Sequence, residues 1–323
     1  AEYWDPVACS SARMFSCPDL GLHTLTVYTW DEAGNNDYCT VRIKIQDNSG
    51  ICGQSRNTIA NGTVESIRDL AMEGVVVTFR DDLGGETYTR QTDQAGTYSS
   101  DQFLADVPYV VSASRDGDWR NGVSTLDLVM IQRHILGLQP LQDPMLLLAA
   151  DANADGKVTA SDLTDLRKLI LGQTTSLPKN KSWIFIHNQE GNEELTPWEM
   201  PRQAYFTAQP QAVYTNNFTG IKVGDVNLNA AGNIGENNTS ARNGHYTAVI
   251  GDIQIYPGRS YRIPVYAGDM TSVMGLQLSL AASEGVTIRG LTSAMLEVRK
   301  SDYHIFEVEG KKMVNISWNS QAP

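Results

Sequence analysis

The sequence is 323 residues long, carries a formal net charge of −12 and has a pI near 4.8. Such an acidic chain is unsuited to binding nucleic acid or an anionic membrane, which attract basic surfaces, but it suits calcium binding and solubility outside the cell. No apolar run reaches the roughly 20 residues of a membrane-spanning helix, so we predict no membrane span. The length allows about two to four domains, and the abrupt start and end suggest a segment of a longer protein.

The N-terminal segment has the alternating pattern of a β-hairpin. Residues 23–30 and 38–46 alternate apolar and polar side chains on either side of a turn sequence. The turn begins Asp31-Glu-Ala-Gly-Asn35 and is soon followed by Cys39. This pattern resembles the last two strands of immunoglobulin-like domains of the hyalin-repeat and polycystic-kidney-disease types. The resemblance covers residues 1–50 and implies that the rest of that sandwich lies upstream or is supplied elsewhere.

All four cysteines lie between positions 9 and 52. Their clustering in a short β-rich segment favours disulfides over metal binding, and their spacing matches no zinc site. In the predicted hairpin, Cys39 lies at the turn end, whereas Cys17 and Cys52 lie at the open end. Because the Cα atoms of a disulfide lie within about 7 Å of each other, we predict a Cys17–Cys52 pair, which leaves Cys9 to pair with Cys39.

Residues 54–113 contain short strand-like runs separated by turns, the pattern of a β-sandwich. The runs lie at residues 62–64, 74–80, 87–90, 96–99 and 108–112. A Gly-Val-Val-Val run that starts at Gly74 and a Thr-Asp-Gln-Ala-Gly-Thr-Tyr run that ends at Tyr98 resemble the carboxypeptidase-regulatory-like domain. The resemblance implies a sandwich without an active site of its own.

Residues 116–137 and 151–172 are near copies, and each opens with the pattern of a calcium loop. In the second copy, Asp151, Asn153 and Asp155 place side-chain oxygens at loop positions 1, 3 and 5, and a glycine follows where the chain must turn. The other ligands that we expect are the carbonyl of Lys157, the hydroxyl of Thr159 and the closing carboxylate of Asp162. The alternative, a polar turn before a helix N-cap, does not explain why the spacing is repeated.

The first copy departs from this pattern. The side chains that keep an oxygen at the ligand positions are Asp116, Asp118, Ser124 and Asp127. Position 5 is Arg120, whose side chain accepts no hydrogen bond and is positively charged. Either the Arg120 carbonyl binds the ion, with the next residue or water filling the gap, or the site binds weakly or keeps its shape without metal. We predict a second calcium ion here, held by these five residues.

Each loop leads into a segment with the periodicity of an amphipathic helix, and no helical pattern precedes the first loop. The apolar stripes consist of Leu128, Ile131 and Ile135 in the first copy and Leu163, Leu166 and Ile170 in the second. Gly137 and Gly172 are expected to end the helices, and residues 145–150 form a short connecting helix. Two equal stripes predict that the helices pack against each other.

This duplicated loop–helix unit, with Asp-Leu at each helix start and Ile-Leu-Gly near each end, resembles dockerin modules over residues 114–175. The first copy is similar to dockerin-like modules of very large surface proteins exported by type IX secretion. The resemblance implies calcium-dependent folding and docking to cohesin modules. Arg120 departs from the dockerin pattern.

Residues 176–240 show little regular pattern, although they contain several large aromatic side chains. Because long irregular segments are uncommon unless they wrap around something, we predict an extension that packs on the dockerin-like module. Residues 218–227 echo a dockerin loop around Asp225 and Asn227 but lack a closing carboxylate. We therefore predict no third metal site here.

Residues 245–323 return to strand patterns at residues 249–266, 273–280, 303–308 and 312–318. The Arg-Ile-Pro-Val run that ends at Val265 and the Gly-Leu-Gln-Leu-Ser-Leu run that starts at Gly275 resemble the opening of a cohesin-like sandwich. We expect this domain to be cut off at Pro323. A dockerin-like module beside a cohesin-like one suggests that the two pack together within one chain or between neighbouring copies.

No enzyme motif stands out: the sequence lacks Gly-x-Ser-x-Gly, His-Glu-x-x-His, P-loop and dinucleotide-binding fingerprints. The expected fold is mainly β, with tandem immunoglobulin-like sandwiches that flank a small α-helical calcium module. We predict a non-catalytic spacer or assembly segment of an extracellular, secreted or cell-surface filament protein that serves adhesion. Its expected partners are neighbouring domains, copies of itself, or a cell-surface or carbohydrate target.

The alternative is an accessory region of a secreted glycoside hydrolase or peptidase whose catalytic domain lies outside this sequence. Fold pattern alone does not separate these two classes, because the same modules occur in both settings. The mass of the intact native protein would distinguish them.

Overall fold

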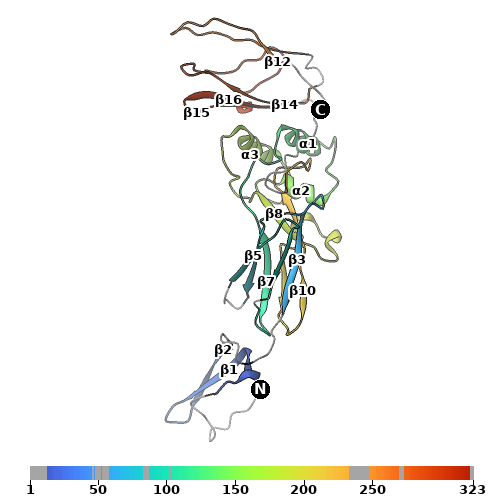
Figure 1. Ribbon diagram of the computed structural model, residues 1–323, viewed down its shortest axis with the longest axis vertical. Helices are drawn as coiled ribbons and strands as arrows, with labels where there is room; N and C mark the ends of the chain where they lie inside the picture. Colours follow the sequence, from blue (N-terminus) through green and yellow to red (C-terminus); the bar gives the residue numbers. More distant parts are fainter. Residues whose placement is uncertain are drawn as a thin grey trace.

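The computed structural model describes residues 13–45, 47, 52, 58–82, 87–101, 103–232, 248–268 and 273–320. These residues form an elongated molecule, with a hairpin at the N-terminal end, then a β-sandwich, a group of helices and a second β region (Figure 1). The fold is mainly β with one small helical region, as the sequence predicts. No helix in the described part of the chain is long and apolar enough to cross a membrane.

The N-terminal hairpin consists of β1 (Gly21–Trp30) and β2 (Asn36–Ile45), which pair antiparallel and follow a short 3₁₀ helix, η1 (Cys17–Asp19). The turn between the strands is held by Asp31, whose carboxylate accepts the backbone N–H groups of Ala33 and Asn35 at 3.0 and 2.8 Å. Lys44 at the end of β2 forms an ion pair with Asp81 of the sandwich at 3.4 Å. The hairpin is therefore tied to the next domain at its open end.

A Cys17–Cys52 disulfide closes that open end, with Cα atoms 5.2 Å apart, and confirms the predicted pair. Cys39 is exposed and forms no disulfide with another described cysteine. Cys9 lies outside the described residues, so the Cys9–Cys39 pair stays a prediction.

The central sandwich has two sheets. One sheet has the order β5 (Thr87–Gln91), β4 (Val76–Asp81), β7 (Pro108–Ser114) and β9 (Gln203–Thr207). The other has the order β10 (Val213–Thr215), β3 (Ile59–Ser66), β11 (Phe218–Lys222) and β8 (Trp183–His187), with β6 (Thr97–Ser100) also paired to β3. Strands β8 to β11 all come from residues 176–240. The prediction that this segment is irregular is therefore wrong.

The reason is that these four strands are short and find their partners far away in the sequence. Strand β9 pairs with β7, and β10 and β11 run parallel to β3. Runs of three to five residues give a weak periodic signal, whereas pairing with an existing sheet satisfies their backbone hydrogen bonds. The segment also contains two 3₁₀ helices, η2 (Asn192–Glu194) and η3 (Pro197–Glu199).

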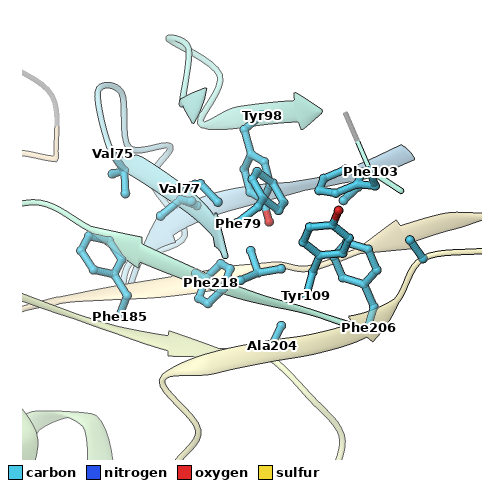
Figure 2. Packing of buried hydrophobic residues seen from close by; sticks show 14 of the residues in the cluster. Val75, Val77, Phe79, Tyr98, Phe103, Tyr109, Phe185, Ala204, Phe206 and Phe218 are labelled. Atoms are coloured by element: carbon cyan, nitrogen blue, oxygen red, sulfur yellow. The ribbon is translucent and has the colours of Figure 1, made fainter. Parts of the chain in front are cut away.

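Aromatic side chains from before and after the three helices in the sequence fill the sandwich core (Figure 2). The ring of Phe103 packs edge-on against Phe79, Tyr109 and Phe206, with centroids 5.1, 5.0 and 5.2 Å apart. Phe206 lies on β9 and Phe218 on β11, and both are buried. Since buried aromatic rings contribute much of the apolar area of a core, residues 203–222 are part of this domain rather than a covering layer.

The helices α1 (Thr125–Ile135), α2 (Pro144–Ala150) and α3 (Ala160–Leu171) lie in the sequence between β7 and β8 of the same sandwich. Leu128 and Leu166 are fully buried in a shared helical core, which also includes Ile186 of β8 and Ile221 of β11. Ile135 is 37% exposed, so the predicted stripe of the first helix ends one turn earlier than expected. The helical module is thus an insertion that shares its core with the sandwich.

The C-terminal region contains a pair of short strands and a three-stranded sheet. The pair is β12 (Ala248–Ile250) with β13 (Val265–Ala267), and the sheet has the order β14 (Gly275–Ala281), β16 (Lys311–Asn319) and β15 (Tyr303–Val308), preceded by η4 (Lys300–Asp302). Val314, Ile316 and Trp318 of β16 form the core of this sheet. The sheet lies directly against α1 and α3 (Figure 1).

Candidate metal centre and docking face

The second loop is curled around the side chain of Asp151. One carboxylate oxygen, Oδ1, accepts the backbone N–H of Asp155 at 3.1 Å, and Oδ2 accepts that of Gly156 at 2.9 Å. Ala154 and Gly156 both have left-handed backbones, with φ of 55° and 80°. This tight curl is the geometry that lets a short loop surround a cation.

Asp162 closes the second loop from the first turn of α3. Its Oδ1 accepts the N–H of Asn153 at 3.1 Å, and its Oδ2 accepts the N–H of Thr159 at 2.8 Å and the Thr159 hydroxyl at 3.3 Å. The residue is fully buried, and this burial raises the pKa of the carboxyl above its ordinary value. A buried carboxylate beside other carboxylates gains from a bound cation.

The loop also has partners that the sequence did not indicate. The indole Nε1 of Trp198 donates to Asp151 Oδ2 at 2.9 Å, and the Asn180 amide donates to the Asp151 carbonyl at 2.9 Å. Arg202 attracts the same carboxylate from within a partly buried position. All three residues lie in the segment that follows α3, where only its aromatic content hinted at a packing role.

The first loop is arranged differently at its start. The Asp116 carboxylate accepts the N–H of Ser182 at 3.0 Å and the ammonium of Lys181 at 3.3 Å. The carbonyl of Arg120, one of the predicted ligands, accepts the N–H of Val123 at 3.1 Å in a turn. Asp116 and Arg120 therefore have hydrogen-bond partners that the calcium-loop pattern does not predict.

A buried lysine lies beside this loop. The Lys222 ammonium donates to the carbonyls of Trp119 and Ser182, both at 3.2 Å, and it attracts the carboxylates of Asp118 and Asp225. Only 4% of the residue is exposed, and this burial lowers the pKa of Lys222 to about 8. Asp118 therefore faces a cationic side chain of the chain itself.

The end of the first loop resembles that of the second. Asp127 is fully buried, and its Oδ2 accepts the N–H and the hydroxyl of Ser124, both at 2.9 Å. Its Oδ1 accepts the N–H groups of Val226 and Asn227 at 2.9 and 3.1 Å. Burial, together with the nearby Asp225 carboxylate, raises the pKa of Asp127 to about 7. The structure thus brings Asp127 to residues 225–227, about one hundred positions along the chain.

Within the described ranges, no three carboxylate, imidazole or thiol groups gather closely enough to hold a metal by themselves. A calcium ion in either loop would therefore depend on amide, hydroxyl and backbone oxygens as well as on carboxylates. The second loop offers such a mixed set in one contiguous stretch, which fits the ligand preference of calcium. Its members are Asp151, Asn153, Asp155, Lys157, Thr159 and Asp162.

A comparison with protein families found a match within the helical module. Residues 117–171 match the dockerin type I domain. Domains of this family are non-catalytic, bind calcium and cohesin partners, and occur in extracellular proteins. No curated protein matches the chain.

The dockerin-like module docks on the C-terminal sheet through hydrogen bonds of Thr125 and a close contact of Val129. The backbone N–H of Thr125, the first residue of α1, donates to the Gln277 side chain of β14 at 2.9 Å. The Thr125 hydroxyl also bonds the Ser317 hydroxyl of β16 at 2.8 Å, and both residues are buried. Gly275 of β14 lies so close that a Cβ there would be 3.0 Å from a methyl group of Val129. The contact is therefore a close-packed interface.

Helix α3 meets the same sheet. The Arg167 guanidinium forms an ion pair with Asp302 at 3.2 Å and also donates to the side chain of Asn319. The amide of Asn315 donates to the carbonyl of Leu171, at the C-terminal end of α3, at 3.1 Å. Both helices that follow the loops are thus held by one face of the β14–β16–β15 sheet.

Proposed function

We propose that this chain is a non-catalytic structural segment of an extracellular surface or filament protein, in which the dockerin module clamps a cohesin-like sheet of the same chain. The segment acts as a calcium-stiffened spacer or assembly element that serves adhesion. The observation that carries this proposal is the buried, polar contact between the two dockerin helices and the β14–β16–β15 sheet.

The side chains at this contact favour a specific interface over chance apposition. The side chains of Arg167 and Asp302 are only 17% and 7% exposed. Separation of the pair would leave a buried charge without its partner, which is strongly destabilising. Thr125, Gln277 and Ser317 satisfy one another across the same surface. A matched set of buried polar groups fixes the register of an interface.

Calcium binding would affect this interface through the first turns of α1 and α3. Each loop ends in a capping box, at Ser124 and Asp127 for α1 and at Thr159 and Asp162 for α3. Because these helices carry the docking residues, an ion that fixes the loop also fixes the position of Thr125. Removal of the ion should therefore loosen the C-terminal sheet as well as the loop.

Small-angle scattering of the whole chain, with saturating calcium and with excess chelator, tests this proposal. We expect a single extended shape in calcium and a broader distribution of dimensions in chelator. Arg167→Ala should broaden the distribution in calcium, whereas Lys168→Ala should not, because the ion pair of Lys168 within the described residues is with Asp165 on the same helix. Limited proteolysis of the C-terminal region should follow the same order.

A widely flexing wild-type chain in saturating calcium would contradict the spacer function. Docking between copies, rather than within one chain, would appear as a molecular mass that rises with concentration and falls in Arg167→Ala. Turnover of a glycan or peptide by the whole chain would contradict the non-catalytic assignment.

A further inference from the structure

Two buried carboxylates lie at the end of the first loop, near amide atoms of Asn227 and Asn229. Asp127 is 0% and Asp225 2% exposed, and the two repel each other electrostatically. Both polar atoms of the Asn227 side chain and the Oδ1 of Asn229 are shielded from solvent and have no hydrogen-bond partner among the residues that the structure describes. Buried polar groups are normally paired, so this cluster of oxygens calls for a cation.

No described side chain supplies that cation directly. The ion pairs within 4.0 Å among the described residues include neither Asp127 nor Asp225. Lys222 attracts Asp225 from a greater distance, but its ammonium donates to the carbonyls of Trp119 and Ser182. The charge of the two buried carboxylates is therefore uncompensated at hydrogen-bond range.

The backbone around Asp225 repeats the hydrogen bonds of the second loop. The Asp151 carboxylate accepts the N–H groups four and five residues later, at 3.1 and 2.9 Å. The Asp225 carboxylate also accepts the N–H groups four and five residues later, from Asn229 and Ala230, at 3.2 and 2.7 Å. The Asp225 carboxylate thus accepts the same pair of backbone hydrogen bonds as the Asp151 carboxylate.

The two segments also meet their closing aspartates in the same way. Asn153 donates its N–H to Oδ1 of Asp162 at 3.1 Å, and Asn227 donates its N–H to Oδ1 of Asp127 at 3.1 Å. The residue after each asparagine has a left-handed backbone, with φ of 55° at Ala154 and 59° at Leu228. A non-glycine residue in this conformation is uncommon, so its recurrence at the same place is informative.

Ala230 lies in contact with Gly122 of the first loop. A Cβ on Gly122 would lie 2.7 Å from Ala230, and the Asn121 side chain forms two hydrogen bonds with the backbone of Ala231, at 2.9 and 3.1 Å. From there the chain runs through Ser124 to Asp127, as the second loop runs through Thr159 to Asp162. Residues 225–230 and residues 122–127 therefore lie next to each other in space, in the order of the two halves of a calcium loop.

We propose that the first repeat binds calcium through a split loop, in which residues 225–230 supply the first half and residues 122–127 supply the second. The oxygen ligands are the side chains of Asp225, Asn227, Asn229 and Asp127, with the Ser124 hydroxyl at the position of Thr159. Asp116, Asp118 and Arg120 take no part. This inference rests on the proposed calcium dependence of the dockerin module and assigns the ligands of its first site.

The donor set points to calcium among the common cations. All of the donors are oxygens, from carboxylates, amides and a hydroxyl, which are the ligands of hard cations. In the split loop, Arg120 at position 5 of the first copy is not a ligand. The split loop therefore explains why an arginine can stand at that position. It also supplies the closing carboxylate that residues 218–227 lack in the sequence.

Calcium stoichiometry of the whole chain tests the split loop, by native mass spectrometry and by calorimetric titration with calcium chloride. We expect two ions for the wild type, one for Asp225→Asn and one for Asn227→Leu. The matched controls Asp116→Asn and Asp118→Asn should keep both ions. Asp151→Asn should lose the other ion, and the Asp151→Asn/Asp225→Asn double variant should bind none.

Thermal melting separates loss of the ion from loss of the fold. In excess chelator, Asp225→Asn should melt at or above the wild-type temperature, because it removes one of two repelling buried charges. Saturating calcium should raise the melting temperature of Asp225→Asn by less than it raises that of the wild type.

Two ions in Asp225→Asn, or the loss of an ion in Asp116→Asn or Asp118→Asn, would overturn the split loop. A wild type that binds one ion, which Asp151→Asn removes, would overturn the split loop but leave the proposed function standing. A wild type that binds no calcium would overturn both.

Discussion

The two repeats of the dockerin-like module have equivalent helices but different loops. Helices α1 and α3 each begin with a capping box, and Leu128 and Leu166 are both fully buried between them. The second loop curls around its own Asp151, whereas Asp116 of the first loop is bound by Ser182 and Lys181. The helix halves of the repeats are thus alike, and the loop halves are not.

This difference teaches that the helix and its loop need not be specified together. A helix of this kind requires a cap and an apolar face, both of which lie within its own sequence. The loop requires only that suitable oxygens reach the closing aspartate. Insertion of the module between β7 and β8 brings residues 225–230 to that place, so a distant segment can take over the role.

The largest effects should show that the helices are equivalent. Leu128→Ala and Leu166→Ala should each lower the free energy of unfolding by about 2–5 kcal/mol, because each leaves a cavity at a fully buried site. Chemical denaturation in calcium measures both, and Leu126→Ala, at an exposed position of α1, should change little. Very unequal losses would break the equivalence of the two helices.

The next effect concerns Lys222, the buried lysine beside the first repeat. The folded-state pKa of Lys222 is about 8, below its ordinary 10.5, so burial of the charge destabilises the fold fully below pH 8. As the pH rises from about 8 to 10.5, the folded chain loses this proton before the unfolded chain does, and stability rises by about 3 kcal/mol. Comparison of wild type and Lys222→Met at pH 7 and pH 10 measures the gain. A constant difference between them would contradict it.

A matched pair of glycines tests the contact between Gly122 and Ala230, on which the proposed split loop depends. Gly122 and Gly156 have φ of 74° and 80°, so alanine at either should cost about 1 kcal/mol from backbone strain. A Cβ at position 156 meets nothing within 4 Å, whereas one at position 122 meets Ala230 at 2.7 Å. Gly122→Ala should therefore be the more destabilising, by thermal melting. Equal losses would mean that Ala230 is not held against Gly122.

The smallest effects should come from the caps and should again be equal. Ser124→Ala and Thr159→Ala each remove the hydroxyl of a capping box, which is worth about 1 kcal/mol. Melting in excess chelator isolates this contribution from that of calcium, and Ser161→Ala at an exposed position of α3 is the control. A loss at only one cap would show that the helix starts differ as well as the loops.

Several features of the site and fold are predictable because they depend on neighbouring residues. The stripes of Leu128 and Leu166, the turn at Asp31 and the contiguous loop from Asp151 to Asp162 are all written in spacings of a few positions. The Cys17–Cys52 pair follows from the two ends of one hairpin. The sequence of the first loop does not show that Asp116 has Ser182 and Lys181 as partners or that Lys222 attracts Asp118, because these partners lie more than 60 positions away.

The sequence by itself determined the β-rich composition of the fold, the duplicated capped helices, the second loop and the N-terminal hairpin with its disulfide. Only the tertiary structure decided that residues 183–222 complete the central sandwich and that the Asp127 carboxylate accepts the N–H groups of Val226 and Asn227. The physical reason is range. Helix periodicity, caps and tight turns act over a few residues, whereas the hydrogen bond from Val226 to Asp127 spans 99 positions.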